Sequence, residues 1–256
     1  MPLARPIIHG SAQIAYGNAQ IAYGNSKSAW SEYPRGLADL LDRFKPRRVC
    51  ELGGGANPAL SLEDIAARGL EYTLLDISAE ELAKAPAGYA RLQADICDPE
   101  LDMPARFDFV FSRMLLEHVP DGGQFHRNVL KMLEPGGVAF HFFPTLFSPP
   151  FLANRLMKPA WTARLLSAFA PRDPVREKKF PAYYSWCRGP TAGQIRRLER
   201  LGYAVLDYRG FFGHNYYARL PAVRRVHGAL ANFLVRHPSP LLTSYAYLLL
   251  RNGVAT

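Results

Sequence analysis

The stretch from residue 49 to residue 58 constrains the fold more than any other part of the chain, because it places an acid and a glycine turn after an apolar run. Glu51 stands near the end of that run, and residues 53 to 55 are glycines, which let the backbone turn tightly. Asn57-Pro58 can then cap and start a helix. This order predicts a strand, a turn and a helix that present backbone N–H groups to a nucleotide-like ligand, although such glycines often form only a tight turn.

Strands and helices are predicted to alternate along the rest of the chain. Ser78 and Asp121 begin two helix candidates. One strand candidate ends at Asp76, 25 positions after Glu51, where a carboxylate can accept hydrogen bonds from both hydroxyls of a ribose. The alternation indicates an α/β fold with a largely parallel sheet. The strand candidates after the first are residues 71 to 75, 89 to 94, 107 to 111, 138 to 143 and 203 to 208.

A set of short motifs follows this frame in order. They are Glu51-x-Gly53-x-Gly55, Asp76, Asp95-Ile96, Phe107-Asp108-Phe109-Val110 running to Leu116-Glu117-His118-Val119, and Leu133-Glu134-Pro135-Gly136-Gly137. The set resembles the motifs of class I S-adenosylmethionine-dependent methyltransferases over roughly residues 47 to 145, with Asn57 where many members carry a third glycine. The resemblance implies a Rossmann-like, doubly wound, seven-stranded sheet that is mostly parallel, with an antiparallel last strand at residues 244 to 250.

The resemblance also implies where the cofactor S-adenosylmethionine binds. The backbone of the glycine turn would face the amino acid part of the cofactor, and Glu51 would help to orient that end. Asp76 would bind the ribose, while Asp95 and Ile96 would hold the adenine. The expected cofactor-binding residues are Glu51, Gly53, Gly54, Gly55, Asp76, Ile77, Asp95, Ile96, Ser112 and Arg113.

Three histidines are candidates for the base that removes a proton from the methyl acceptor. His118 is the first choice, because it follows the fourth strand and an imidazole titrates near neutral pH. Some small-molecule members of the family have a base histidine at a similar offset, and a histidine that only hydrogen-bonds locally is the alternative reading. His141 in the fifth strand and His214 in a later insertion are the other two candidates. None of the three has metal-ligand spacing to another, so no metal is expected.

The chain is expected to form one main domain with elaborations. Residues 1 to 46 are predicted to be an N-terminal arm and helix, and residues 47 to 256 a single methyltransferase domain. Helical insertions at about residues 144 to 190 and 209 to 240 are expected to form a cap on the acceptor side.

The N-terminal arm contains a heptapeptide that occurs twice in succession, at residues 12 to 18 and 19 to 25. Seven residues are too few for a solenoid unit, so the duplication predicts a loosely held segment. The alternative is that Tyr16 or Tyr23 folds over the active site as part of a latch.

Charge is divided unevenly between the two parts of the chain. Residues 1 to 150 have a net charge of −4, and residues 151 to 256 have a net charge of +13, within a total of +9. Such a basic half favours an anionic partner, namely a metabolite, a lipid headgroup or nucleic acid, although solvated surface arginines would give the same count. A basic amphipathic helix is predicted around residues 223 to 236, and it can lie on a membrane surface or pack on its own domain.

Three widely spaced cysteines argue against a disulfide framework or a zinc site and favour a reducing compartment. The chain has no apolar run long enough for a membrane span and no apolar core of a secretion signal. We therefore expect a cytoplasmic protein, with peripheral contact at the inner face of a membrane as an extension of that expectation.

The function expected from these features is methyl transfer, by in-line displacement, to oxygen or less favourably nitrogen of a small anionic, glycosidic or lipid-linked acceptor. Three alternatives stay open. A nucleic-acid methyltransferase would use the basic half, although no recognised binding module supports it. An NAD-dependent oxidoreductase would share the glycine turn, but its pattern requires glycine or alanine where Pro58 stands. The third is a non-catalytic subunit that binds the cofactor and serves a partner.

Overall fold

The computed structural model describes residues 12–16, 19–103, 107–148, 151, 181–217 and 219–253. The strands are β1 (Ala12–Tyr16), β2 (Ala19–Asn25), β3 (Arg48–Leu52), β4 (Glu71–Asp76), β5 (Ala90–Gln93), β6 (Phe107–Arg113), β7 (Leu133–Pro144), β8 (Tyr203–Phe212) and β9 (Tyr245–Asn252). The helices are α1 (Ser26–Phe44), α2 (Leu62–Arg68), α3 (Ala79–Lys84), α4 (Gly122–Met132), α7 (Ala192–Glu199) and α8 (Pro221–Arg236), with short 3-10 turns η1 (Leu116–His118) and η2 (Pro240–Leu242).

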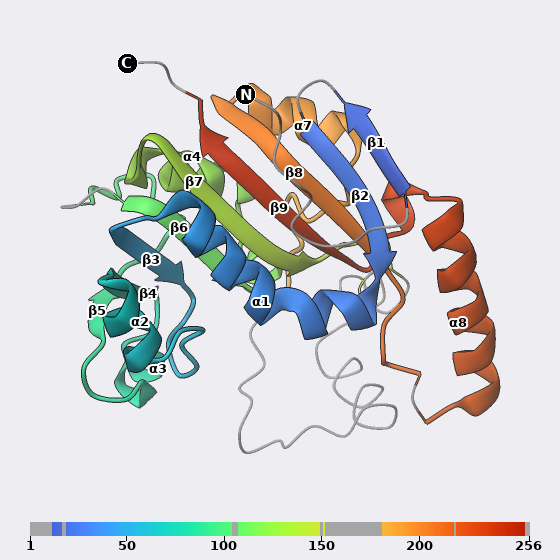
Figure 1. Cartoon of the computed structure of the whole chain (residues 1–256), viewed down its shortest axis with the longest axis horizontal. Helices are drawn as coiled ribbons and strands as arrows, with labels where there is room; N and C mark the ends of the chain where they lie inside the picture. The colour runs from blue at the N-terminus through green and yellow to red at the C-terminus, as the bar shows by residue number, and fades with distance from the viewer. Residues whose placement is uncertain are drawn as a thin grey trace.

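All these strands form one sheet in the order β1-β2-β8-β9-β7-β6-β3-β4-β5 (Figure 1). The strands from β3 to β9 make up the expected seven-stranded, mostly parallel unit, and β9 runs antiparallel to both of its neighbours, β7 and β8. The predicted α/β fold with an antiparallel last strand is thus confirmed. The described sheet is nevertheless wider than predicted, because β1 and β2 extend it beyond β8.

The duplicated heptapeptide forms these two additional strands, so the expectation of a loosely held arm is wrong for its described residues. Its two copies pair with each other in an antiparallel hairpin centred on Ile14 opposite Ile21, and β2 then pairs in parallel with β8. Tyr23 is buried at 2% exposure and stacks on Phe212, with ring centroids 5.7 Å apart. This burial raises the pKa of Tyr23 to about 12 and removes it as a latch over the site.

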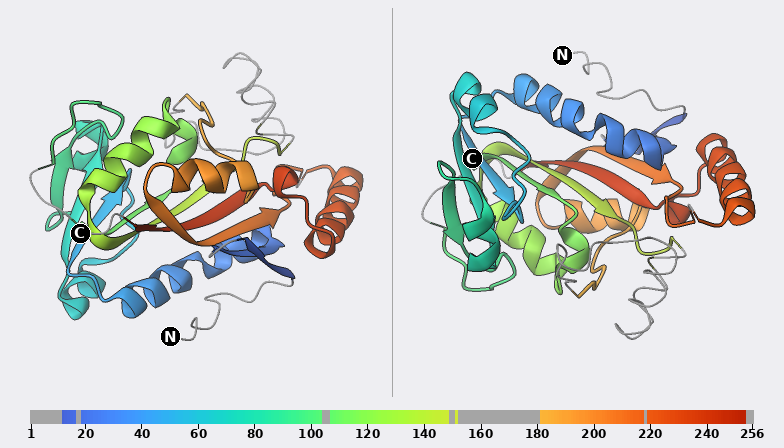
Figure 2. Two further views of the ribbon diagram at one scale, coloured as in Figure 1. Left: turned by 90° about the horizontal axis from the view of Figure 1, so that it is seen from above. Right: turned by 90° about the horizontal axis from the view of Figure 1, so that it is seen from below.

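Helices cover both faces of the sheet (Figure 2). On one face α1 buries an apolar side that includes Tyr33, whose ring stacks on Phe140 and Phe142 of β7. On the other face α4 buries Phe125 and α7 buries Ile195. Because residues from every central strand meet these helices, the central strands are apolar on both faces, as expected for a parallel sheet.

The helix starts that shape the site depend on local capping. Asp121 and Ser78 cap α4 and α3 as predicted. The helix after the glycine turn, however, does not begin at Asn57-Pro58. It begins after Ser61, which forms a capping box with Asp64. The Ser61 side chain accepts the N–H of Asp64, and the Asp64 side chain accepts the N–H of Ser61.

The two predicted insertions have different outcomes. Of the first insertion, residues 149–150 and 152–180 lie outside the described residues. The second begins later than predicted, because β8 continues to Phe212 and pairs up to Phe211 with Tyr245 of β9. Its main element is α8, which lies at the end of the molecule opposite to β4 and β5 (Figure 1).

Candidate functional site

A cavity of about 560 Å³ opens where β3, β4 and β6 reach their carboxyl ends. In parallel α/β sheets, ligands bind at this edge beside the point where the strand order reverses, which here lies between β3 and β6. The predicted site residues among its lining are Glu51, Gly53, Asp76, Ile77, Asp95, Ile96, Arg113 and His118.

Glu51 lies against the glycine turn and bonds to the chain that follows it. Its carboxylate accepts the N–H of Ala59 at 2.9 Å and the hydroxyl of Tyr72. Burial raises the pKa of Glu51. A Cβ atom on Gly54 would lie 2.6 Å from the carboxyl carbon of Glu51, and Gly53 has a φ of +71°, which glycine adopts without strain. The close approach of Glu51 therefore requires a glycine at position 54.

Asp76 stands at the other side of the same turn. Its Oδ1 atom accepts the N–H of Ser78 at 2.9 Å, and burial raises the pKa of its carboxyl. A Cβ atom on Gly55 would lie 2.9 Å from Asp76 Oδ2, so bare backbone and a carboxylate oxygen face each other at close range. A half-buried carboxylate at the end of this strand is the acceptor that ribose hydroxyls require, and the site fits an adenosyl group.

The far end of this cavity is suited to a flat apolar ring that carries an amine. Asp95 closes a turn by accepting the N–H of Cys97 at 2.8 Å. Ile96 lines the cavity, and Asn128 of α4 donates to its carbonyl oxygen at 2.9 Å, which fixes this loop on the core. Ile77 is 60% exposed and also lines the cavity. Two isoleucines and an acid match the faces and the edge of an adenine.

His118 lines the cavity from η1, the short turn after β6. Its Nδ1 atom lies 2.7 Å from the carbonyl oxygen of Pro181, so Nδ1 donates and the neutral ring keeps its lone pair on Nε2. Nε2 lies 3.8 Å from Glu117 Oε1. Burial raises the pKa of Glu117 to about 8, so this carboxyl retains its proton at neutral pH.

Ser112 and His141, both predicted site residues, lie elsewhere. Ser112 Oγ and His141 Nδ1 are 2.8 Å apart and fully buried, and the ring of His141 packs against Phe125 of α4. The structure thus places them in the core on the α4 face and not in the lining of the cavity. Burial lowers the pKa of His141 well below its ordinary value, as expected for a neutral core histidine.

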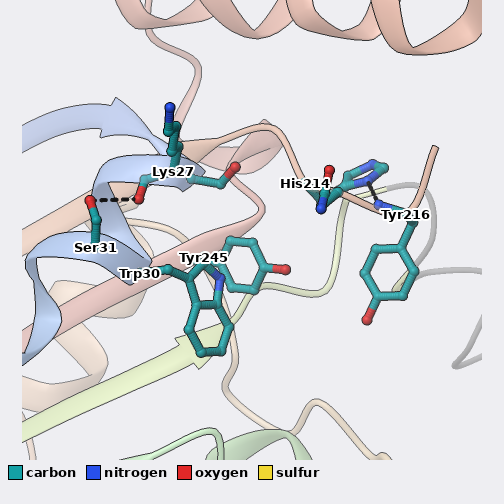
Figure 3. A pocket seen from close by; sticks show the side chains of 8 residues that line it. Lys27, Trp30, Ser31, His214, Tyr216 and Tyr245 are labelled. Atoms are coloured by element: carbon teal, nitrogen blue, oxygen red, sulfur yellow. Dashed lines mark hydrogen bonds between the residues drawn. The ribbon is translucent and has the colours of Figure 1, made fainter. Parts of the chain in front are cut away.

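His214 lines a second cavity of about 900 Å³ at the same edge of the sheet (Figure 3). Trp30, Tyr216 and Tyr245 provide aromatic walls, and Lys27 from the start of α1 adds a cation. Burial and the nearby His227 lower the pKa of His214 to about 3, so it is neutral.

Sequence reasoning missed Lys27, Trp30 and Tyr245 as site residues. Lys27 and Trp30 lie in the segment that was predicted to be an arm and helix outside the domain. Their position follows from the pairing of β2 with β8, because α1 begins directly after β2 and so starts at the carboxyl edge of the sheet. Helical spacing of the apolar residues in α1 predicted the helix but not this location.

Phe142 of β7 contacts a lining residue of each cavity. The ring of Trp30, which lines the second cavity, has its centroid 4.9 Å from that of Phe142. Met114, which lines the first cavity, donates its N–H to the carbonyl oxygen of Phe142 at 2.7 Å. One strand residue therefore contacts the walls of both cavities.

Among the described residues, no group of three His, Cys, Asp or Glu side chains is placed to hold a metal ion. Within the same part of the chain, no helix has the length and apolar character needed to cross a membrane.

The strand order, the glycine turn and the two acids at successive strand ends define a class I S-adenosylmethionine-dependent methyltransferase. A family model described as a methyltransferase domain matches residues 29–207, and the chain belongs to this family. S-adenosylmethionine is thus its cofactor, which confirms the prediction from the motifs.

The sequence is similar to most of one methyltransferase and to a small part of a much longer synthase. It is 28% identical over 183 residues to the ubiquinone biosynthesis O-methyltransferase of Aeromonas salmonicida, which covers 66% of this chain and 72% of that protein. It is 31% identical over 145 residues to the highly reducing polyketide synthase Preu5 of Preussia isomera. That match covers 50% of this chain, which spans only 6% of the synthase.

Solved structures share the fold at low sequence identity. An S-adenosylmethionine-dependent methyltransferase from Clostridium acetobutylicum superposes with a TM-score of 0.54 at 11% identity, covering 88% of this chain and 92% of that one. The N-methyltransferase NodS from Bradyrhizobium japonicum has a TM-score of 0.51 at 13% identity, covering 90% and 99%. At these identities the similarity establishes the fold alone.

Proposed function

We propose that this enzyme transfers a methyl group from S-adenosylmethionine to oxygen, or less favourably nitrogen, of a small anionic, glycosidic or lipid-linked acceptor. The observation that carries the proposal is the second cavity, with its aromatic walls and lysine, whose Trp30 packs on Phe142 of β7, the residue that also bonds to Met114 in the lining of the cofactor cavity. Oxygen is favoured because the Aeromonas relative is an O-methyltransferase.

The cofactor, when bound, supplies a methyl group on a positively charged sulfur, which an acceptor atom attacks in line. The chain's own residues have to hold the two reactants aligned, and such positioning alone can contribute several orders of magnitude in rate. In this proposal Asp76 binds the ribose and Asp95 accepts from the adenine amine. Glu51 keeps the turn at residues 53 to 55 in place, so that its backbone faces the amino acid part.

His118 is the proposed base. With the proton on Nδ1, which faces the carbonyl oxygen of Pro181, Nε2 is the basic atom of the ring. Because Glu117 retains its own proton at neutral pH, it adds no negative charge that would favour premature protonation of the imidazole. His214 would then serve in acceptor binding, since its low pKa makes it a weak base.

The acceptor class follows from the lining of the second cavity. Trp30 and Tyr245 present flat faces that can stack on an aromatic ring or on the apolar face of a sugar. Lys27 supplies a positive charge to an anionic group. A cap formed by residues 213 to 240 would cover this side of the site.

A cytoplasmic location at the inner face of a membrane is part of the proposal. It is supported by the free cysteines Cys50, Cys97 and Cys187 and by the cationic second half of the chain. A lipid-linked acceptor would be reached from that position.

The test has two stages. Calorimetry with S-adenosylmethionine measures cofactor binding by the folded protein, and release of S-adenosylhomocysteine is then followed with a panel of acceptors. The panel contains phenolic acids, sugar acids and phospholipid-linked phenols, each with a neutral analogue. Preference for the charged member, weakened by Lys27→Gln but not by Lys45→Gln, would support the proposed acceptor class. Equal turnover of charged and neutral members would contradict it.

A further inference from the structure

Helix α8 carries an apolar face that no other described part of the chain covers. Only Ala231 and Leu234 of this helix are buried. On a neighbouring side, four large apolar residues recur at helical spacing and are at least two fifths exposed. They are Val223 (43%), Val226 (72%), Leu230 (52%) and Phe233 (56%), which we call the α8 apolar face.

Further exposed apolar residues continue this surface in the chain. Leu220 precedes the helix at 36% exposure, and Leu241 and Leu242 follow it in η2 at 51% and 48%. Most of the large apolar residues that are exposed in the described part of the chain therefore belong to one segment. The α8 apolar face is contiguous by its helical spacing, and a contiguous apolar patch marks an interaction site, whereas single exposed apolar residues are ordinary on a soluble surface.

The same segment is cationic throughout. Asp207 is the last acidic residue of the sequence, and six arginines follow it. Arg225 and Arg236 are exposed on α8 itself. On a helical projection both lie beside the α8 apolar face, on the side away from the buried residues, where long side chains can extend to an anionic surface while the apolar face inserts.

The α8 segment also adjoins the second cavity. The ring of His227 on α8 lies 4.1 Å from the ring of His214, which lines that cavity. Gly213, which precedes His214, packs against Ala231, so the buried side of α8 adjoins the cavity wall. Both views in Figure 2 place α8 at one end of the molecule, beyond the sheet.

We propose that the α8 apolar face docks on an anionic lipid bilayer, with Arg225 and Arg236 at the level of the headgroups. Apolar side chains flanked by arginines, on a helix that does not span the membrane, match the interfacial region of a bilayer. A second copy of this chain fits less well, because two faces with arginines and no acids would repel each other.

This docking deepens the proposed function, since it would bring a lipid-linked acceptor to the mouth of the second cavity. The surface itself needs no catalysis, so its test uses no activity. Cofactor binding measured on the same samples then separates failure of docking from failure of the methyltransferase assignment.

The test is sedimentation of the full chain with vesicles of phosphatidylcholine, alone or mixed with phosphatidylglycerol. The wild type should sediment with the mixed vesicles, weakly with the neutral ones, and less at high salt. Val226→Ser/Phe233→Ser should lower the affinity for mixed vesicles at least tenfold. Arg225→Gln/Arg236→Gln should remove most of the preference for the anionic lipid.

Two variants control for loss of charge or of exposed apolar area elsewhere. Arg196→Gln/Arg200→Gln removes the same charge from α7 and its C-cap, and Leu62→Ser changes an apolar residue of α2 that is 39% exposed. Both should sediment like the wild type, and all variants should bind S-adenosylmethionine normally. Failure of the wild type to bind mixed vesicles would overturn the proposal. So would unchanged binding by the α8 variants, or a dimer in sedimentation equilibrium that Val226→Ser/Phe233→Ser dissociates.

Discussion

The imidazole of His118 is held by Pro181, whose carbonyl oxygen lies 2.7 Å from Nδ1. A carbonyl oxygen can only accept, so this contact selects the tautomer with the proton on Nδ1. The contact joins η1 to Pro181 in the first insertion, 63 positions further along the chain. In this tautomer Nε2 is the basic atom of the ring.

Replacing His118 by Asn should lower turnover at least about tenfold and leave the affinity for S-adenosylmethionine unchanged, because the amide can still donate to Pro181 but cannot take up a proton. Turnover is measured by release of S-adenosylhomocysteine and affinity by calorimetry. His237→Asn, at the exposed end of α8, is the matched control and should behave as the wild type. Unchanged turnover in His118→Asn would remove it as the base.

Replacing Asp76 by Asn should weaken S-adenosylmethionine binding by about tenfold or more. Hydrogen bonds to a charged group contribute about 1.5–3 kcal/mol, and the amide can accept at only one of its two atoms. Isothermal titration gives the dissociation constant. Glu63→Gln changes an exposed acid of α2 and should leave this constant unaltered; an equal loss in both variants would point to overall charge and not to a ribose contact.

Gly54→Ala should destabilise the fold by about 1–3 kcal/mol and weaken cofactor binding, since the new Cβ would lie 2.6 Å from the carboxyl carbon of Glu51. That carboxylate cannot move away freely, because Ala59 and Tyr72 hold it. Gly193→Ala on α7, where no atom lies within 4 Å of the new Cβ, should be neutral or slightly stabilising. Denaturant unfolding compares the two, and similar losses would contradict the proposed role of Glu51.

Glu117→Gln should change the pH dependence of stability. The pKa of Glu117 is raised from its ordinary value of 4.5 to about 8 by burial. Between these two pH values the folded state binds a proton that the unfolded state releases, so the free energy of unfolding of the wild type falls as pH rises. Gln resembles the protonated carboxyl and removes this dependence.

The stability of Glu117→Gln relative to the wild type should therefore increase from pH 4.5 to pH 8, by at most about 1.4 kcal/mol per pH unit. Chemical denaturation at a series of pH values measures it. Parallel profiles for the two proteins would show that Glu117 is ionised in the folded state.

Trp30→Ala should raise the KM for the acceptor severalfold, since loss of a stacking face weakens binding by about 0.5–1.5 kcal/mol. The affinity for S-adenosylmethionine should stay within about twofold of the wild type, because Trp30 lines only the second cavity. Steady-state kinetics with the best acceptor of the panel tests this. A change in cofactor affinity with an unaltered KM would place the acceptor elsewhere.

Neighbouring residues at a strand end show where prediction from the sequence was insufficient. Ser112 and Arg113 are adjacent, and both were expected at the cofactor. Because side chains alternate along a strand, only Arg113 reaches the cavity, while Ser112 points to the α4 face and meets His141. The motif locates the strand end but does not say which face each side chain takes.

The duplicated heptapeptide shows a second limit. The local sequence of each copy is a short mixture of polar and apolar residues and does not predict which strand it pairs with. Its order comes from pairing with β8, whose residues lie more than 180 positions away along the chain, and from burial of Tyr23 against Phe212. Contacts over such separations are not encoded in any local pattern.

The sequence by itself determined the parallel α/β fold, because alternating strand and helix candidates rest on short-range rules, and the resemblance of its motifs supplied the antiparallel last strand. The acids proposed to bind the cofactor stay a prediction of the same motifs. Glycines after an apolar run predict a turn, and a carboxylate where a strand stops predicts a polar group at the strand end. Both predictions need only a few neighbouring residues. Only the tertiary structure decided that α1 begins beside the second cavity, that His118 contacts Pro181, and that α8 has an uncovered apolar face. These depend on which distant segments pack together, and packing is a property of the whole chain.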